Sequence, residues 1–488
     1  MAGKGSKDPE ESKDIGITAK KEEDYGEWFS QIITKAELVE YTDVSGCYVY
    51  RPNSFEIWEK VRDFMDYEFR KRGVRNGYFP LFIPEKLLMK EQEHVEGFTP
   101  EVAWVTHTGS SKLAERLAVR PTSEIIMYDS YGKWIRSWRD LPLKINQWSN
   151  VVRWEFKNPV PFIRSREFLW QEGHNVFASK EEVEKDVLEM LDVYELTYKE
   201  MYSVPVIKGY KTDSEKFAGG DYTTTCEVFL PNGKAAQGCT SHNLGQNFAK
   251  ALDITFLDKD EKKKHVWQDS WGFSTRTIGI MIGMHSDNKG LVLPPKVATV
   301  QAVIVPILFD KTKEQVLAKC DELKRGLSDC FSVILDDREE YTPGWKFNDW
   351  EMKGVPLRIE VGPKDIEKGQ AVTVRRDTGD KEFVKLDNLK DHVQLTLEKI
   401  QEELYDNALR MRQENTIDAA SMQDLMKAIK DKQLVRTNWC GSEECEALIK
   451  DKTNGAKIIC IPFDEKPNGK CVHCGKDSKH EVYVAKSY

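Results

Sequence analysis

The sequence lacks the segments that would take it into or across a membrane. Its longest apolar runs fall far short of the roughly 18–20 residues that a membrane-spanning helix needs. Residues 1–23 contain no apolar stretch, which excludes a secretory signal, and they lack Arg, which argues against a mitochondrial transit peptide. We therefore expect no membrane association, a cytoplasmic location and a disordered tail over residues 1–20.

Two common nucleotide-binding patterns are also missing. The chain has no G-x-x-x-x-G-K-[ST] loop and no G-x-G-x-x-G after a strand, so a P-loop and a Rossmann dinucleotide site are both excluded. The net charge of -9 does not by itself indicate a nucleic-acid-binding protein, although basic residues can still gather on one face. A bound nucleotide would have to be held by other groups.

Cysteine is scarce until the last 49 residues, which hold five of the ten. In a chain without a secretion signal, such clustering indicates a metal site and not disulfides. Cys440-x4-Cys445 and Cys471-x2-Cys474 form two pairs, and four thiolates suit a tetrahedral, structural Zn2+ with no open position. Cys460 lies between aliphatic residues and is predicted to be a buried core thiol. The alternative is five unrelated cysteines.

Arginine stands within or at the end of otherwise apolar and aromatic runs at two places about a hundred residues apart, Val151–Phe156 and Ser270–Arg276. Both runs are typical of strands. Alternation along the first puts Arg153 and Glu155 on one face of a strand. Such a pair is often structural, but a planar guanidinium on an apolar strand also suits phosphate oxygens.

A third arginine strengthens the phosphate hypothesis. Arg164 follows a proline-containing loop, so a hairpin would bring it beside Arg153. With Arg276, three guanidinium groups would then be available, and such a set predicts a polyphosphate, and hence a nucleotide, bound on a sheet.

The hydrophobic patterns outline the rest of the chain. Sequential hairpins predict a largely antiparallel sheet with helices on one face, and after residues 290–295 alternating strands and helices predict a small α/β domain. We expect Asn53 to cap the first long helix. The predicted helices are 53–73, 125–138, 181–202, 312–328, 345–353 and 401–414, with Ser179 and Glu182 as a capping box before the third. The predicted strands include 222–230, 275–284, 299–308, 333–335, 357–361 and 371–376.

These arginine segments resemble motifs 2 and 3 of the class II aminoacyl-tRNA synthetases. From about residue 20 onward the chain resembles the eukaryote-like and archaeal prolyl-tRNA synthetases, and helix 53–73 with the strand ending at Pro84 resembles motif 1, which builds the dimer interface in that family. The resemblance implies a multidomain α+β fold. Its expected parts are a disordered tail (1–20), a class II catalytic domain (21–297), an α/β anticodon-binding domain (298–400) and a C-terminal zinc-binding α+β domain (401–488).

The resemblance also implies residue roles. ATP would be bound by Arg153, Glu155, Arg164, Phe168, Gln237, Thr240 and Arg276, with Arg153 and Arg276 acting in catalysis. Proline would be bound by Thr122, Glu124, Arg153, Trp170, Glu172, His174, Phe217 and His242.

Two of these groups have other interpretations from the residues alone. Thr122 and Glu124 also suit an ordinary helix start. Alternation places Trp170, Glu172 and His174 on one side of a strand, where they would suit a small apolar ring with a secondary amine. A zinc site of His174 and His242 is disfavoured, because no Cys or carboxylate cluster completes it.

The implied function is the activation of L-proline with ATP and Mg2+, followed by transfer to the 3′ end of tRNA(Pro). The expected partners are L-proline, tRNA(Pro), a second copy of the chain and a multi-synthetase complex. A threonyl or glycyl enzyme is an alternative that the aromatic Trp170 and Phe217 disfavour. A non-catalytic RNA-binding paralogue is another, disfavoured by the presence of all three motif arginines.

Overall fold

The computed structural model describes residues 16–94 and 101–488, with the side chains of 90–94 left aside. Most of the predicted disordered tail, 1–20, lies outside these residues. The described chain divides into two compact units. The larger contains Val39–His285, Pro294–Thr299 and Thr396–Tyr488, and the smaller contains the residues up to Leu38, Ser286–Leu293 and Val300–Leu395.

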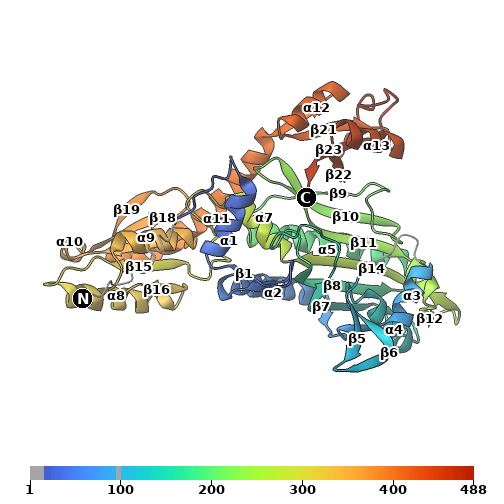
Figure 1. Ribbon diagram of the computed structural model, residues 1–488, viewed down its shortest axis with the longest axis horizontal. Helices are drawn as coiled ribbons and strands as arrows, with labels where there is room; N and C mark the ends of the chain where they lie inside the picture. The colour runs from blue at the N-terminus through green and yellow to red at the C-terminus, as the bar shows by residue number, and fades with distance from the viewer. Residues whose placement is uncertain (1–15, 95–100) are drawn as a thin grey trace, which may run out of the picture. The chain divides into compact units, whose positions relative to one another are not determined.

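The larger unit is built on an antiparallel sheet (Figure 1), as predicted. Its central strands lie in the order β9-β10-β11-β14-β8-β7, and each pairs antiparallel with its neighbour. A short edge strand, β3, runs parallel to β7. Their bounds are β3 Arg75–Asn76, β7 Leu143–Val152, β8 Glu167–Phe177, β9 Ile207–Tyr210, β10 Tyr222–Phe229, β11 Lys234–Gly245 and β14 Trp267–Ser274.

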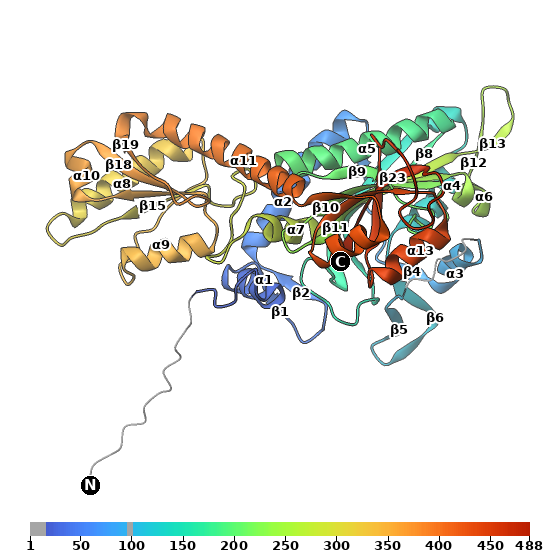
Figure 2. The same ribbon diagram turned by 90° about the horizontal axis from the view of Figure 1, so that it is seen from above.

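Helix α5 (Lys180–Glu200) packs against this sheet (Figure 2). Its predicted capping box is confirmed, because Ser179 and Glu182 bond each other's backbone N–H groups. The ring of Phe273 in β14 stacks with Tyr194 and Tyr202, and so ties α5 and the turn after it to the sheet. Aromatic pairs of this kind add to the apolar burial that holds a helix on a sheet.

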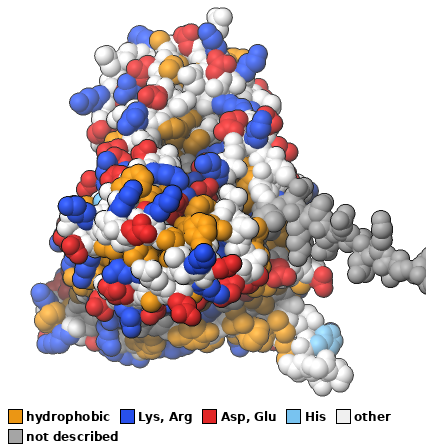
Figure 3. Space-filling model, turned by 90° about the vertical axis from the view of Figure 1, so that its left-hand side faces the viewer, with side chains coloured by type: hydrophobic (Ala, Val, Ile, Leu, Met, Phe, Trp, Pro, Cys, Tyr) orange, Lys and Arg blue, Asp and Glu red, His pale blue; other side chains and the backbone are white. Residues whose placement is uncertain are grey.

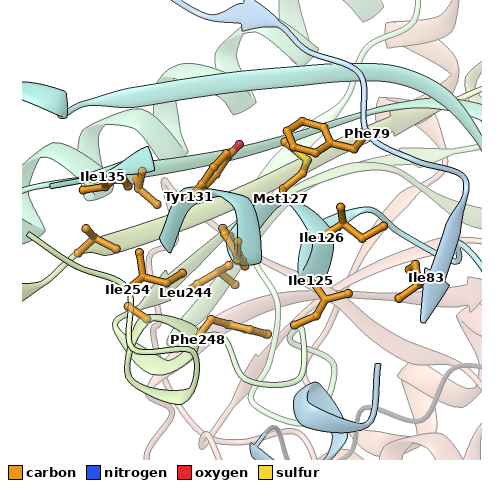
Figure 4. Close-up of a cluster of buried hydrophobic side chains, with 14 of the residues drawn as sticks. Phe79, Ile83, Ile125, Ile126, Met127, Tyr131, Ile135, Leu244, Phe248 and Ile254 are labelled. Carbon is orange, nitrogen blue, oxygen red and sulfur yellow. The ribbon is translucent and has the colours of Figure 1, made fainter. Parts of the chain in front are cut away.

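Helix α4 (Glu124–Trp134) is the centre of a second apolar cluster (Figure 4). Ile125 and Tyr131 of α4 lie there with side chains from α6 and neighbouring segments, such as Phe248 and Ile254. This burial fixes the N-terminal end of α4, so residues 122–124 are held rigidly.

The predicted strand at 275–284 is wrong, because Arg276–His285 forms helix α7. Every residue from Thr277 to Met284 is buried. A helix that is apolar all round lacks the one-sided pattern that distinguishes helix from strand, and a short apolar run fits both. At Gly279 a Cβ atom would lie 2.7 Å from the side chain of Ile163, so a glycine here lets α7 approach the segment that carries Arg164.

The predicted cap of the first long helix is also wrong. Helix α2 covers Pro52–Lys71, with Arg51 at the N-cap and Pro52 in the first turn. Proline is favoured there because the first N–H groups of a helix have no partner within it. The predicted end is confirmed, because Gly73 follows the helix with φ +79°.

The smaller unit has the α/β fold expected from the alternating pattern. Its sheet has the order β16-β15-β17-β18-β19. The first three strands are parallel to one another, whereas β18 pairs antiparallel with β17 and β19 pairs antiparallel with β18. Strand β19 was not predicted. The bounds are β15 Ala302–Pro306, β16 Val333–Leu335, β17 Leu357–Val361, β18 Gln370–Arg375, β19 Lys381–Lys385, α8 Lys313–Ser328, α9 Pro343–Met352 and α10 Pro363–Glu367.

The C-terminal segment continues the larger sheet. Strand β22 pairs with β9, and the end of β23 pairs with β11. The charged helix expected at 401–414 begins earlier, as α11 Leu389–Glu414. It is followed by β20 Thr416–Ala419, α12 Met422–Lys430, β21 Leu434–Trp439, α13 Glu443–Lys452, β22 Lys457–Pro462 and β23 His480–Ser487.

Short elements complete the described chain. They are α1 Tyr25–Lys35, β1 Val39–Tyr41, β2 Tyr48–Tyr50, β4 Phe82–Pro84, α3 Glu85–His94, β5 Trp104–Thr108, β6 Ser111–Val119, α6 Asn247–Ala251, β12 Thr255–Leu257, β13 Lys263–His265 and two 3-10 turns, Trp138–Asp140 and Leu386–Asn388. None of the helices in the described residues combines the length and apolar character that crossing a bilayer demands.

The tight contact between Gly173 and Trp271 at the centre of the sheet predicts how a substitution there would affect stability. Gly173 in β8 lies opposite Trp271 in β14, and a Cβ atom on it would come 2.1 Å from the indole ring. We expect Gly173→Ala to lower the free energy of unfolding by about 1–3 kcal/mol, because the buried indole must move. The urea midpoint, followed by tryptophan fluorescence, measures the change.

Gly132→Ala is the matched control, since in α4 the nearest atom to its added Cβ lies 4.0 Å away. There the same substitution should raise stability by about 0.5–1 kcal/mol, because alanine favours a helix over glycine. If Gly173→Ala proves as stable as Gly132→Ala, the packing described for Trp271 is wrong.

Candidate active site

A cavity of about 420 Å3 opens on the sheet face opposite α5. It is lined by all eight residues predicted to bind proline: Thr122, Glu124, Arg153, Trp170, Glu172, His174, Phe217 and His242. Of the predicted ATP residues, Arg153, Glu155, Gln237 and Thr240 also line it, whereas Arg164, Phe168 and Arg276 lie outside its lining.

Strand β8 supplies one wall. Trp170, Glu172 and His174 all line the cavity, as their alternation predicted. Across the sheet, Glu172 pairs with Gly272 and His174 with Ser270 of β14. Small residues opposite large ones leave open space above the sheet, which is why the cavity forms here.

The carboxylate of Glu172 is occupied by protein donors. It accepts hydrogen bonds from the hydroxyl of Thr122 at 2.7 Å and the backbone N–H of Ser123 at 2.8 Å, and His174 Nε2 lies 3.1 Å away. Burial opposes the charged form, but the bonds from His174 and Ser123 outweigh it and hold the pKa of Glu172 below its usual range. Glu172 therefore fixes the 122–124 segment.

Glu124, in the first turn of α4, is a second buried carboxylate beside Glu172 of β8. It is buried, and its Oε1 lies 3.8 Å from His174 Nδ1. Its position in the first helical turn places negative charge where the helix dipole favours it. The segment therefore begins a helix, as one reading predicted, and also lines the cavity, while its role in binding proline stays a prediction.

Arg153 and Glu155 do not share a strand face, which corrects the sequence argument. Strand β7 ends at Val152, and Arg153 follows it, with its backbone N–H bonded to the carbonyl of Arg166. The Arg153 Nε donates to the carbonyl of Pro121 at 3.0 Å, and its guanidinium lies 5.0 Å from the Trp170 ring. The strand ends because the chain turns there into the proline-containing loop.

The three arginines act on one another electrostatically. Arg276 Nε donates to the carbonyl of Ile163, next to Arg164, and its Nη1 reaches the carbonyl of Gln237 at 3.5 Å. Burial lowers the pKa of Arg276, and the charges of Arg153 and Arg164 lower it further. Like charges gathered in this way favour an anion between them.

Strand β11 brings Gln237, Thr240 and His242 to the cavity. The pairing of β10 with β11 shifts at Gly238, so that Cys226 pairs with Cys239 but Glu227 with Gln237. This bulge breaks the alternation of faces and turns Gln237 to the same side as Thr240 and His242. A Cβ atom on Gly238 would lie 2.4 Å from the hydroxyl of Tyr198.

His242 is a neutral side chain in this wall. Burial, with the charge of His174 as a smaller cause, lowers its pKa to about 3. Its two ring nitrogens each lie 2.9 Å from a hydroxyl, Nδ1 from Thr223 and Nε2 from Thr240. The Phe217 ring lies 4.7 Å from the imidazole, so an aromatic ring and a neutral imidazole stand side by side in this wall.

Several lining residues were missed by sequence reasoning. Ser270 and Gly272 could have been found from strand alternation, because they are alternate residues of the strand that leads to Arg276. Glu215 lies in the loop after β9 and carries no local sequence signal. Its place at the cavity depends on tertiary packing alone.

The four predicted metal ligands come together. The sulfurs of Cys440, Cys445, Cys471 and Cys474 all lie within 4.8 Å of one another, and the sulfurs of Cys440 and Cys474 are 3.7 Å apart. Zinc–sulfur bonds of about 2.3 Å at tetrahedral angles place sulfurs about 3.8 Å apart, so the cluster fits Zn2+. Cys460 is fully buried in the apolar core, as predicted.

A backbone donor supports the thiolate form of one ligand. The N–H of Lys476 lowers the pKa of the Cys474 thiol to about 7. Elsewhere in the described chain no other group of three or more His, Cys, Asp or Glu gathers as potential metal ligands, and His174 with His242 is not such a group.

Three family models match successive parts of the chain. Residues 104–285 match the tRNA synthetase class II core domain (G, H, P, S and T), residues 301–396 an anticodon-binding domain, and residues 422–488 the C-terminal part of prolyl-tRNA synthetase. These matches cover the cavity, the smaller sheet and the cysteine cluster respectively.

Individual relatives match along the whole chain. A cytoplasmic proline–tRNA ligase of Arabidopsis thaliana is 49% identical over all of this chain and 94% of its own length. A proline–tRNA ligase of Natranaerobius thermophilus is 51% identical over 96% of this chain and 97% of its own. A bifunctional glutamate/proline–tRNA ligase of Cricetulus griseus is 47% identical over 98% of this chain and 33% of its own length.

The depressed pKa of His242 predicts a pH effect on stability. Its pKa is about 3 in the folded chain and 6.5 in the unfolded one, so the unfolded state binds more protons between these values, and stability falls as pH falls below 6.5. His242→Gln removes this contribution. The melting temperature of the variant should therefore drop less than that of the wild type from about pH 7.5 to about pH 5.

His107→Gln is the control, because His107 is exposed on β5. It should lose melting temperature with pH as the wild type does. Equal losses for His242→Gln and the wild type would show that His242 is already charged, or free to become charged, in the folded state.

Proposed function

The chain belongs to the prolyl-tRNA synthetases of the class II aminoacyl-tRNA ligases, and from this membership we propose how its residues perform the reaction. The enzyme activates L-proline with ATP and transfers it to tRNA(Pro). The observation that supports the assignment of residues is a cavity lined by aromatic rings, carboxylates and Arg153, together with the electrostatic action of Arg153 and Arg164 on Arg276.

Proline would lie within the cavity. Its apolar ring suits the aromatic side chains of Trp170 and Phe217, with the neutral His242 beside them. Its secondary ammonium would bond Glu124 and the hydroxyl of Thr122, while Glu172 orients that segment and His174. Its carboxylate would face Arg153.

ATP would lie against the arginines. Arg153 would hold the α-phosphate, and Arg164 and Arg276 the distal phosphates, with Glu155 and Phe168 at the adenosine and with Gln237 and Thr240 on the neighbouring strand. A carboxylate oxygen of proline forms a bond to the α-phosphorus, the bond to pyrophosphate breaks, and pyrophosphate leaves with its electron pair. Positioning and charge neutralisation supply the catalysis, without a protein nucleophile.

Mg2+ use goes with this class of enzyme. When bound, Mg2+ would neutralise part of the phosphate charge. The phosphate oxygens of ATP would be its main ligands.

We propose that the domain at 298–400 reads the anticodon of tRNA(Pro), and that the tRNA end reaches the cavity of the catalytic domain, 21–297. In the smaller unit a second cavity of about 320 Å3 includes Phe309, which is 62% exposed, and Tyr341, whose ring lies 3.8 Å from that of Trp345. Exposed rings suit stacking on unpaired bases of an RNA loop. The face seen in Figure 3 exposes apolar side chains among basic and acidic ones.

The segment Leu357–Lys364, which resembles the family sequence in that domain, is less available. It forms β17 and the start of α10, and Arg358 is paired with Glu351 and Glu360 and lies 4.0 Å from the Phe347 ring. Base contacts are therefore proposed for the cavity around Phe309.

The other partners remain proposals. A homodimer would use α2 and β4, where Phe55, Tyr67 and Phe82 are exposed. A cytoplasmic location agrees with the name of the Arabidopsis relative, and a place in a multi-synthetase complex agrees with the bifunctional Cricetulus griseus relative. The threonyl, glycyl and non-catalytic alternatives receive no support from the relatives, which are named for proline.

The domain at 401–488 is proposed to hold one structural Zn2+ through Cys440, Cys445, Cys471 and Cys474. Four protein thiolates leave no position for a substrate, so the ion would stabilise the fold and take no part in the chemistry.

The proposed reaction is tested by ATP–pyrophosphate exchange, measured with a panel of amino acids. L-Proline should drive exchange, and threonine and glycine should not. Arg153→Ala should lower the proline-dependent rate by about 10²–10³-fold, because the charge developing at the α-phosphate loses its partner.

The matched control is Arg436→Ala, which removes an arginine that pairs with Asp418 in the C-terminal segment, away from the cavity lining. It should exchange at the wild-type rate. Exchange driven only by another amino acid would overturn the specificity, and near-normal exchange by Arg153→Ala would remove that residue from the mechanism.

The zinc proposal predicts about one Zn atom per chain in purified protein, measured by mass spectrometry of the metal. Cys471→Ser should lose most of it, because Cys471 is one of the four clustered thiols. Cys330→Ser, which changes an exposed cysteine outside the cluster, should keep it. A wild-type protein without zinc, or equal zinc in both variants, would reject the site.

A further inference from the structure

The loop between β9 and β10, residues 211–221, is held by the C-terminal segment. This pocket loop supplies Glu215 and Phe217 to the cavity lining. Two side chains of the C-terminal segment bind it, Glu446 on α13 and Lys457 on β22, and Asn247 of α6 donates to the Gly219 carbonyl at its other end. The cysteine-cluster domain therefore reaches the wall of the proline cavity.

Lys457 binds the loop through an ion pair. Its Nζ lies 2.8 Å and 3.0 Å from the two carboxylate oxygens of Glu215. The two side chains are 35% and 29% exposed, so the pair is only partly screened by water. Donation to both oxygens fixes the carboxylate's orientation as well as its position.

Glu446 binds the loop through a buried hydrogen bond. The hydroxyl of Thr212 donates to Glu446 Oε1 at 2.7 Å, and both residues are buried. Glu446 Oε2 has no hydrogen-bond partner, so this carboxylate depends on Thr212. Because α13 also carries Cys445, one helix joins the cysteine cluster to the pocket loop.

Hydrogen bonds also link the pocket loop to a residue in the cavity wall. The backbone N–H of Phe217 donates to the hydroxyl of Thr223 at 2.9 Å, and the same hydroxyl lies 2.9 Å from Nδ1 of His242. A shift of the loop would therefore move the Phe217 ring and disturb His242 together. Both residues face the space that suits the proline ring.

We propose that Lys457 and Glu446 are positioning residues for the amino-acid substrate, which set the affinity for proline by fixing the pocket loop from outside. This rests on the proposed function. The arginines proposed for ATP lie on the β7–β8 hairpin and on α7, and none of their described bonds involves the pocket loop. Loosening the loop should therefore weaken proline binding far more than ATP binding, to which the loop is linked only through the contact of His242 with Thr240.

The experiment compares Lys457→Met with Lys457→Arg in the full-length, metal-loaded enzyme. The KM values for proline and for ATP, and kcat, are measured by ATP–pyrophosphate exchange. Lys457→Met should raise the proline KM by about 5- to 10-fold, since small misplacements at a binding site are costly. Its ATP KM should stay within about twofold of wild type, and Lys457→Arg, which keeps the charge, should restore the proline KM.

A double-mutant cycle tests the second contact. Glu446→Ala and Thr212→Val each remove the bond, so each should raise the proline KM, and the double variant should raise it no further than the larger single effect. Glu446→Gln keeps an acceptor oxygen and should stay near wild type. Circular dichroism and the ATP KM verify that each variant is folded.

The outcomes separate the two levels of the proposal. A wild-type enzyme without proline-dependent exchange would reject the proposed function itself. With wild-type exchange present, an unchanged proline KM in Lys457→Met and Glu446→Ala would overturn the positioning role. Proline and ATP KM values that rise together would also overturn it, because they would show a general loss of structure.

Discussion

The electrostatic constraint at the centre of this molecule is the mutual repulsion of three arginines, because the charges of Arg153 and Arg164 both act on Arg276. Burial and mutual repulsion both disfavour the charged form of Arg276. Backbone carbonyls fix two of these groups, because Arg153 donates to Pro121 and Arg276 donates to Ile163 and Gln237. A triphosphate would relieve the repulsion, so the site is arranged in advance for a substrate with that charge.

The sheet makes this arrangement possible by separating its two faces. On one face, aromatic rings pack α5 against β14, and the large buried Trp271 is accommodated by Gly173. On the other, Gly272 and Ser270 leave space beside Glu172 and His174. The bulge at Gly238 then turns Gln237 to the cavity side. The tight packing on the α5 face and the open space on the cavity face both result from the same pairs of residues on β8 and β14.

Much of the fold and the site followed from the sequence, and the failures have physical causes. The antiparallel sheet, the capping box at Ser179 and the cysteine cluster were predicted because each has a local signal. Helix α7 was mistaken for a strand because a fully buried helix has no polar face. The bulge in β11 and the role of Glu215 left no such signal, since both depend on contacts made by residues far apart in the chain. The residues proposed for proline converge on one cavity, but sequence alone could not show that Glu172 serves Thr122 and Ser123.

The most direct test of the central claim is an experimental structure of the enzyme with ATP and L-proline bound. We expect the triphosphate to lie between Arg153, Arg164 and Arg276, with each guanidinium within hydrogen-bond distance, about 2.7–3.2 Å, of a phosphate oxygen. A triphosphate bound elsewhere, or contacted by fewer than two of these arginines, would contradict the account.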